Sequence, residues 1–79
     1  MKKINIGIIG LGTIGTGVYK ILKQRRGEIK KRYNIEVNIN KCCDISTTIK
    51  KKLKIPSNVF TKDFYEITNS SDIDLVIEL

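Results

Sequence analysis

Three glycines and one carboxylate are the residues of this chain whose types and spacing suggest chemistry. Gly10, Gly12 and Gly15 follow the apolar run Ile4 to Ile9 and precede a helical pattern that begins near Thr13. Gly10 would permit a tight turn from strand to helix, Gly12 would let backbone N–H groups approach a pyrophosphate, and Gly15 would let the helix lie close to the sheet. The frame therefore predicts a dinucleotide-binding loop at a helix N-terminus. The alternative is a tight turn that binds no ligand.

The residues between these glycines are expected to lie beside the same ligand. Leu11, Thr13 and Ile14 occupy the variable positions of the frame, where backbone N–H groups face the phosphates. The Thr13 hydroxyl offers a further hydrogen bond, whereas Ile14 has an alternative role as a core contact in the first helical turn. Glu78, near the end of the chain, is interpreted as a rim or structural carboxylate rather than a catalytic one.

Asp44 is the carboxylate, and it stands at the end of the second predicted strand. An acid at that place accepts hydrogen bonds from the adenosine ribose, although Asp44 lies further from Gly15 than the typical spacing of about 20 residues. It favours NAD over NADP because a carboxylate would repel a 2′-phosphate. Lys50 to Lys52 are near enough along the chain to reach such a phosphate, so NADP stays open. The alternative role of Asp44 is to cap the turn before Ser46.

The pattern of apolar residues predicts alternating strands and helices. β-Branched runs predict strands, and apolar residues at helical spacing predict a long first helix. Gly27 weakens that helix by about 1 kcal/mol relative to alanine, which allows a kink or a break there. Ser46 or Thr47 would cap the second helix. The expected strands cover residues 4–9, 35–43, 59–61 and 74–79, and the expected helices cover residues 13–31, 46–53 and 63–68.

This order of elements predicts an α/β fold with a Rossmann-type doubly wound parallel sheet. The 79 residues would form the N-terminal βαβ half of that fold plus one further strand. In the usual strand order 3-2-1-4, ligands bind at the carboxyl ends of the strands that flank the switch point. Leu11 to Ile14, Glu78 and Leu79 are therefore expected to lie at one crevice.

Composition limits the other function classes. The chain has a net charge of +7, no histidine and two adjacent cysteines, Cys42 and Cys43. Adjacent cysteines suit neither an ordinary disulfide nor a zinc site, so we expect reduced thiols and no bound metal. No apolar stretch reaches the roughly 20 residues that span a bilayer, which favours a cytoplasmic protein without membrane contact. The cations are interleaved with apolar residues along the first helical segment and form a second run at Lys50 to Lys54, which favours solvated helix faces over a nucleic-acid surface.

Two segments of the chain resemble a known family. Residues 8–22, IIGLGTIGTGVYKIL, and residues 72–79, DIDLVIEL, are similar to the amino-terminal region of homoserine dehydrogenases. The resemblance implies NAD(P)-dependent interconversion of L-aspartate 4-semialdehyde and L-homoserine, a step in threonine, methionine and isoleucine biosynthesis. Many members place an arginine that holds the NADP phosphate next to the aspartate; here the residue before Asp44 is Cys43, which favours NAD further. The resemblance also implies that five loop residues contact the cofactor: Gly10, Gly12, Thr13, Ile14 and Gly15.

The same resemblance implies that the chemistry lies elsewhere. The family's catalytic lysine and aspartate belong to a later domain, so no residue of this chain is expected to be catalytic. We expect residues 1–79 to be an N-terminal fragment of a dinucleotide-binding domain, without the substrate and dimerisation domain, in an enzyme that forms homo-oligomers. The alternatives are another NAD(P)-dependent oxidoreductase with the same glycine frame, or a nucleotide-sensing or basic nucleic-acid-binding module.

Overall fold

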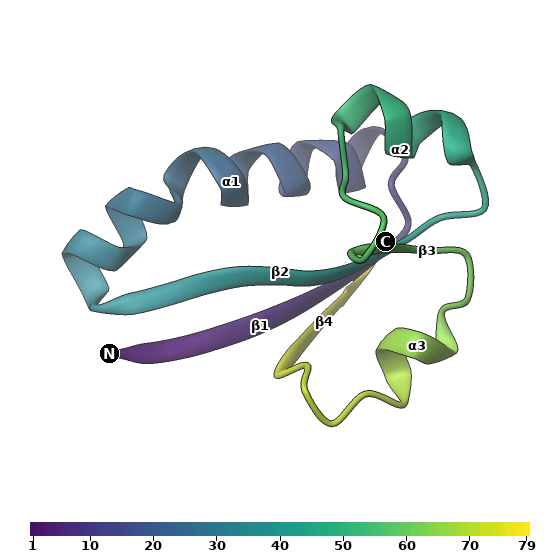
Figure 1. Ribbon diagram of the computed structural model, residues 1–79. Helices are drawn as coiled ribbons and strands as arrows, with labels where there is room; N and C mark the ends of the chain where they lie inside the picture. The colour runs from purple at the N-terminus through teal and green to yellow at the C-terminus, as the bar shows by residue number, and fades with distance from the viewer.

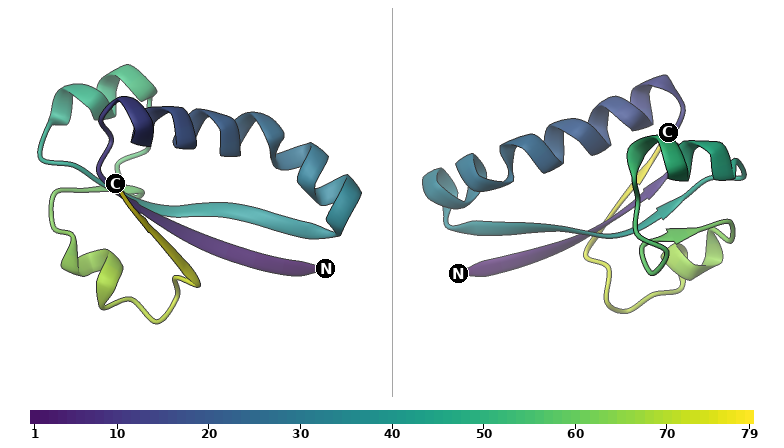
Figure 2. Two further views of the ribbon diagram at one scale, coloured as in Figure 1. Left: turned by 180° about the vertical axis from the view of Figure 1, so that it is seen from behind. Right: turned by 45° about the horizontal axis from the view of Figure 1, so that its top comes forward.

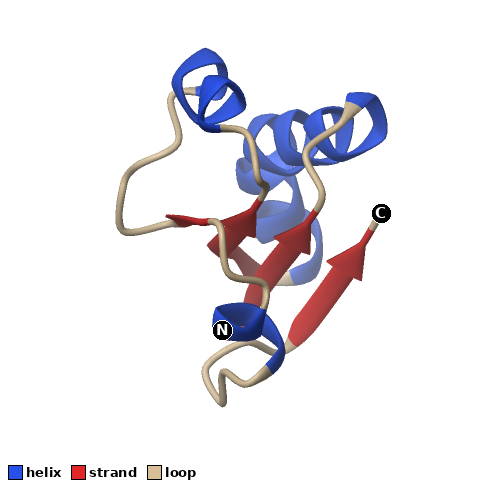
Figure 3. Cartoon of the chain, turned by 90° about the vertical axis from the view of Figure 1, so that its right-hand side faces the viewer, coloured by secondary structure: helices blue, strands red, loops and turns tan.

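The computed structural model describes all residues, 1–79, as a four-stranded parallel sheet with helices on both faces. Helices α1 and α2 lie on one face and α3 on the other, as the views in Figures 1, 2 and 3 show. The elements follow in the order β1 (Lys2–Ile9), α1 (Thr13–Tyr33), β2 (Ile35–Cys43), α2 (Thr47–Leu53), β3 (Phe60–Thr61), α3 (Tyr65–Thr68) and β4 (Leu75–Glu78).

The sheet has the strand order β3-β2-β1-β4, which confirms the predicted order 3-2-1-4 and the doubly wound α/β class. β1 is central and pairs with β2 along its full length, whereas it pairs with β4 only from Ile6 to Ile9. A register shift between Ile6 and Gly7 leaves Asn40 of β2 as the extra residue of a bulge. Because the strands are parallel, their carboxyl ends meet at one edge of the sheet, where ligands bind in this class of fold.

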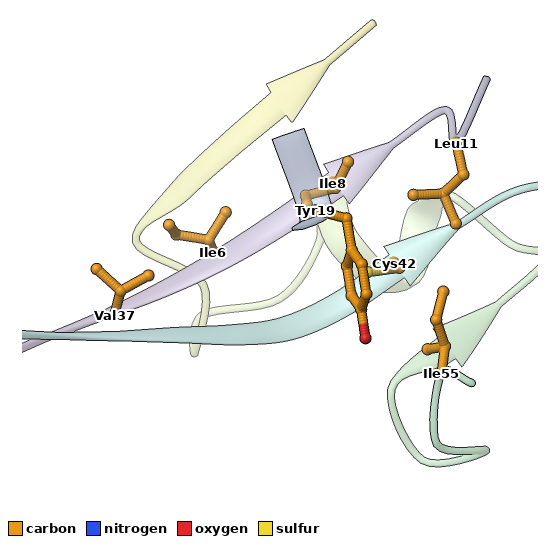
Figure 4. Packing of buried hydrophobic residues seen from close by; sticks show 7 residues of the cluster. All are labelled: Ile6, Ile8, Leu11, Tyr19, Val37, Cys42 and Ile55. Carbon is orange, nitrogen blue, oxygen red and sulfur yellow. The ribbon is translucent and has the colours of Figure 1, made fainter. Parts of the chain in front are cut away.

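The main core lies between the sheet and the helices α1 and α2 (Figure 4). Ile8 of β1 and Cys42 of β2 are paired across the sheet and are both fully buried. Tyr19 of α1 and Ile55 after α2 belong to the same cluster. Burial raises the pKa of the Cys42 thiol to about 12. Both cysteines are free, as expected, and Cys42 is a neutral packing side chain.

On the opposite face, α3 lies against a glycine that the sequence analysis did not interpret. A Cβ atom at Gly7 would lie only 2.6 Å from Cγ2 of Ile67 and 3.1 Å from Cδ1 of Ile73. Ile67 is almost fully buried there. The missing side chain at Gly7 therefore lets α3 and the turn that follows it pack directly on β1.

Helix α1 is continuous through Gly27, so the break that this glycine allowed does not occur. Glu28 forms ion pairs with Arg25 at 3.2 Å and with Arg32 at 3.8 Å; the first pair spans the glycine and the second follows it. Such helix pairs contribute about 0.2–0.5 kcal/mol each and offset part of the glycine penalty. The helix ends at Asn34, which adopts the left-handed conformation with φ 56° and donates its N–H to the carbonyl oxygen of Lys30. No helix of the structure is both long and apolar enough to cross a membrane.

The later elements are shorter than expected because local side-chain contacts begin or end them. Ser46 holds the N-cap position of α2, as predicted, but its side chain makes no capping hydrogen bond, and its N–H donates to Asp44. Asp63 accepts the N–H of Tyr65 in a turn, so α3 begins two residues later than expected. β4 begins at Leu75 and covers four residues.

Candidate dinucleotide-binding site

The glycine loop, residues 10–12, leaves the carboxyl end of β1 between the ends of β2 and β4. Gly10 donates its N–H to the carbonyl oxygen of Cys43 at 2.9 Å, and Leu79 donates its N–H to that of Ile9 at 2.9 Å. Gly10 has φ +95°, which L side chains rarely adopt, and a Cβ atom there would lie 2.8 Å from the Leu79 carbonyl oxygen. The tight turn expected of Gly10 is therefore present, at the switch point of the sheet.

Gly15 is required by a close approach of backbone to backbone. A Cβ atom at this buried position would overlap the carbonyl group of Gly10. The first turn of α1 therefore lies directly against the end of β1, and the sequence expectation of a close approach at Gly15 is met there.

Gly12 differs from both, because nothing within the chain requires a glycine there. Its φ of −68° is ordinary for any residue, and a Cβ atom built on it meets no atom within 4 Å. The space over Gly12 is open and exposed. A side chain would extend into this space, so the missing Cβ leaves room for a group that approaches the loop from outside.

Four consecutive backbone N–H groups around Gly12 have no acceptor within the chain. They belong to Gly12, Thr13, Ile14 and Gly15, and the first helical hydrogen bond is donated by Thr16 to the Gly12 carbonyl oxygen at 2.8 Å. No side chain caps this end of α1, and its first turn contains no acid. Unsatisfied N–H groups and the positive end of the helix dipole form an anion-binding arrangement that fits a diphosphate.

The structure refines the roles of Thr13 and Ile14. Both belong to the first turn of α1 rather than to the loop before it. The side chain of Ile14 is 70% exposed, so its alternative role as a core contact is wrong. Each contributes a free backbone N–H, and contact with the cofactor stays a prediction for both.

Leu11 anchors the loop. Its N–H donates to Oδ2 of Asp44 at 2.8 Å, its carbonyl oxygen accepts the Thr16 hydroxyl at 3.0 Å, and its side chain is buried. The polar groups of its backbone are thus used inside the protein. Direct contact of Leu11 with a ligand stays a prediction. The sequence did not indicate this role of the Thr16 hydroxyl, because Thr16 lies close to the Leu11 carbonyl only in the folded loop.

Asp44 joins the end of β2 to the glycine loop. Its Oδ2 accepts the Leu11 N–H, and its Oδ1 accepts the Ser46 N–H at 2.9 Å. The turn-capping role is therefore present, together with a link to the loop that the sequence did not reveal. Each carboxylate oxygen has a second acceptor site, so Asp44 keeps the capacity to bind ribose hydroxyls, and this role stays a prediction.

The two residues next to Asp44 differ in burial, since Cys43 is buried and Ile45 is exposed. Cys43 is 6% exposed, and its pKa is raised first by burial and then by the nearby carboxylates, chiefly Asp44. A buried neutral thiol does not hold a phosphate. Ile45 is 87% exposed at the rim, and no motif had singled it out.

Glu78 ends β4 beside Ile9, whereas Leu79 lies against Gly10.

Comparisons with known proteins agree on one family. Residues 10–79 match the family model described as homoserine dehydrogenase, NAD binding domain. Homoserine dehydrogenase of Neisseria gonorrhoeae is 39% identical over 79 residues, and that of Bacillus subtilis is 33% identical over the same length. The chain belongs to the homoserine dehydrogenase family. Among the oxidoreductase families that share the glycine frame, the match identifies this one. The matched domain is an NAD-binding domain, so the cofactor class is NAD(P).

Solved homoserine dehydrogenase structures share the fold. The S. aureus enzyme at pH 7.5 has a TM-score of 0.87 and 36% sequence identity over 99% of this chain, and the Thiobacillus denitrificans enzyme has a TM-score of 0.82 and 27% identity. The chain spans 18% of the length of the Neisseria and Bacillus relatives and 19% of the S. aureus chain.

Proposed function

We propose that this chain binds the adenosine and diphosphate half of NAD(P) for a homoserine dehydrogenase. The whole enzyme would interconvert L-aspartate 4-semialdehyde and L-homoserine in the biosynthesis of threonine, methionine and isoleucine. The observation that carries the proposal is the open space over Gly12 beside four unpaired backbone N–H groups. The NAD(P) cofactor accepts or supplies the hydride, and the residues of this chain bind and orient it.

The proposed contacts divide between the two ends of the loop. N–H groups of Gly12, Thr13, Ile14 and Gly15 would hold the diphosphate, while Gly10 and Leu11 keep the loop in shape. Asp44 would accept hydrogen bonds from the adenosine ribose, which favours NAD. The membership and the open loop support this assignment. We further propose that the enzyme is cytoplasmic and forms homo-oligomers, and that homoserine and aspartate semialdehyde are its small-molecule substrates.

The test is titration of the chain with NADH, followed by fluorescence, for the native chain and two matched variants. Gly12→Val should abolish NADH binding because its side chain occupies the space over the loop, while circular dichroism should show a folded chain. Gly27→Val carries the same change in α1, where a Cβ also meets no atom within 4 Å, and should bind NADH normally. Equal NADH affinity in the two variants would contradict the proposal. So would strongly salt-dependent DNA binding without an NADH signal.

A second expectation concerns catalysis. Since the chain spans less than a fifth of its relatives, the groups that hold the semialdehyde against the nicotinamide would lie outside residues 1–79. The chain alone should therefore oxidise no homoserine in the presence of NAD or NADP. Measurable NADH formation from homoserine by these 79 residues would overturn this division of roles.

A further inference from the structure

The strand β2 has a free edge along most of its length. On one side it pairs with β1 from Ile35 to Cys43, whereas on the other side β3 pairs only with Cys42 and Cys43. Residues 35–40 therefore have no neighbouring strand on the side away from β1. Such an edge presents unpaired backbone N–H and C=O groups with which a further strand could pair.

A hollow lies beside this edge, between β2, α1 and the loop before β3. Its volume is about 170 Å³; a cavity of about 150 Å³ holds a benzene molecule, so the hollow has room for one apolar side chain. Its apolar lining comes from Leu22, Val37, Ile39, Pro56 and Val59. No residue of the glycine loop lines it, and neither does Asp44, so the hollow is separate from the proposed dinucleotide site.

Tyr19 brings an unpartnered hydroxyl to this hollow. The residue is only 5% exposed, yet its hydroxyl makes no hydrogen bond within the chain. Figure 4 shows the hydroxyl directed away from Ile8 and past Cys42, and Tyr19 lines the hollow. A buried tyrosine usually places its hydroxyl on a partner. An acceptor that enters the hollow from outside would supply that partner.

The rim of the hollow carries two cations and no acid. Lys23 and Arg26 line it. Nζ of Lys23 lies 5.7 Å from the ring centroid of Tyr19 and has no carboxylate within 4.0 Å, while Arg26 pairs with Glu36 of β2 at 3.4 Å. Lysine and arginine donate hydrogen bonds and accept none. Together with the Tyr19 hydroxyl they favour a carboxylate beside the apolar floor.

A second copy of the chain does not fit this edge. Pairing of two β2 edges about a two-fold axis would bring Lys23 and Arg26 of one copy toward the same residues of the other. Glu36 is the only acid of β2 and is already paired with Arg26. The net charge of +7 adds a general repulsion between copies. The charges therefore favour an acidic partner of a different kind.

We propose that the free edge of β2 binds an extended peptide segment that carries an apolar and an acidic side chain two residues apart. The segment adds a strand beside residues 35–40 of β2. Side chains two residues apart lie on the same face of a strand, so the apolar one enters the hollow while the acidic one reaches Lys23 and Arg26. The Tyr19 hydroxyl donates to an oxygen of the segment.

The test is an NMR titration with the capped heptapeptide TETLTET, whose leucine has a glutamate two residues away in either direction. Lys23→Gln combined with Arg26→Gln should raise the Kd of this peptide roughly tenfold, because two charge contacts are lost. The matched control, Lys31→Gln combined with Lys51→Gln, removes the same charge from exposed positions outside the hollow. It should leave the Kd within about twofold of the native value. Equal losses in the two double variants, or equal binding of the peptide TKTLTKT, would overturn the proposal.

A variant without a change in charge tests the hydroxyl. Tyr19→Phe should leave the Tm unchanged or higher, because the hydroxyl has no partner in the chain, and should raise the Kd of the peptide roughly threefold. Tyr33→Phe changes a side chain that is 64% exposed and lies outside this hollow, and should bind the peptide as the native chain does. An unchanged Kd in Tyr19→Phe would contradict the proposed site.

Hydrogen exchange separates strand addition from attraction by charge alone. The peptide should slow exchange of the amides of residues 36–40 and leave those of β4 unchanged. Protection of β4 instead would assign the peptide to the other edge of the sheet. Protection of residues 36–40 that rises with protein concentration in the absence of peptide would assign the edge to a second copy. Either result would overturn the proposal.

The peptide site and the dinucleotide site should act independently. Saturating NADH should leave the Kd of the peptide unchanged, and Gly12→Val should bind the peptide as the native chain does, because the glycine loop does not line this hollow. Failure of the peptide to bind a chain that binds NADH would overturn this inference alone. Failure of NADH to bind a chain that binds the peptide would contradict the proposed function alone.

Discussion

At the scale of single residues, the glycines of the loop have different physical reasons to be glycine. Gly10 is needed for its backbone angle, Gly15 for contact with neighbouring backbone, and Gly12 for neither. The sequence frame predicted all three positions, because turn geometry and spacing are local properties. It could not show that only Gly12 is free of constraint from the chain itself, since that depends on what surrounds each Cα in the folded protein.

This difference predicts that the same substitution destabilises the chain far more at Gly15 than at Gly12. Gly15→Ala should lower the free energy of unfolding by about 1–3 kcal/mol or more, because its methyl group overlaps the Gly10 carbonyl and forces the backbone to shift. Gly12→Ala should lower it less, by at most about 1 kcal/mol, which is the cost of alanine in place of glycine at the N-cap of α1. Urea denaturation followed by circular dichroism measures both values. If Gly15→Ala loses no more stability than Gly12→Ala, the first turn of α1 moves away from the Gly10 carbonyl without further cost in free energy.

Cys42 predicts how stability depends on pH. Its folded pKa is raised from 9.0 to about 12, mainly by burial. The folded chain therefore keeps the thiol proton between pH 9 and 12, whereas the unfolded chain loses it. The stabilising effect is complete below pH 9 and declines as pH rises through this window, by up to about 1.4 kcal/mol per pH unit.

The measurement is the free energy of unfolding from urea titrations between pH 7 and 10. Cys42→Ala should reduce the slope above pH 9, and the slope that remains reports Cys43 and Tyr19, whose pKa values are also raised. An identical slope in the variant would mean that Cys42 ionises in the folded chain as readily as in the unfolded one.

At the scale of elements, a ladder of polar side chains fixes β4 against β1. Asn5 donates its backbone N–H to Oδ2 of Asp74 at 2.8 Å, and Asp74 donates its own N–H to the Asn5 carbonyl oxygen at 2.8 Å. The side chain of Asn38 on β2 donates to that of Asn5 at 3.0 Å. The polar Asn5 inside an apolar strand therefore links β1 to β2 and to the residue before β4.

Removing the carboxylate of this ladder should loosen β4. Asp74→Ala leaves the Asn5 N–H without an acceptor and should lower the free energy of unfolding by about 1 kcal/mol. Asp74→Asn keeps one acceptor oxygen and should restore most of that loss. Hydrogen exchange of the amides of Leu75 to Glu78 should become faster in the alanine variant only. Slow exchange in both variants would mean that backbone pairing alone holds the strand.

The same elements show how far the sequence could predict the structure. The bounds of β2 and the start of α1 follow from β-branched patterns and helical spacing, and the structure confirms them. The bulge after Ile6 depends on the pairing of distant segments and was not predictable locally. The late start of α3 comes from the local Asp63 turn, which competes with the helix and which the apolar pattern does not reveal. The link from Asp44 to Leu11 joins residues 33 positions apart. Sequence patterns placed both residues at the site without showing that one holds the other.

At the scale of the whole molecule, the chain has a small core. Only 12 of its 79 residues are buried, and Leu75 and Val76 of the edge strand β4 are 48% and 41% exposed. A chain of this size buries a smaller share of its surface than a larger domain does, and an exposed strand edge is open to further pairing. We therefore expect a stability near the lower end of the range for folded domains.

Low intrinsic stability makes ligand binding visible as a thermal shift. A ligand that binds only the folded chain at 100 times its Kd adds about 2.7 kcal/mol, which corresponds to roughly 10–20 °C in Tm for a domain of this length. NADH should produce this shift in the native chain and in Gly27→Val, but not in Gly12→Val, whose loop is blocked. Differential scanning fluorimetry at several NADH concentrations measures it. A shift in Gly12→Val equal to the native one would mean that the nucleotide stabilises the fold from a surface other than the glycine loop.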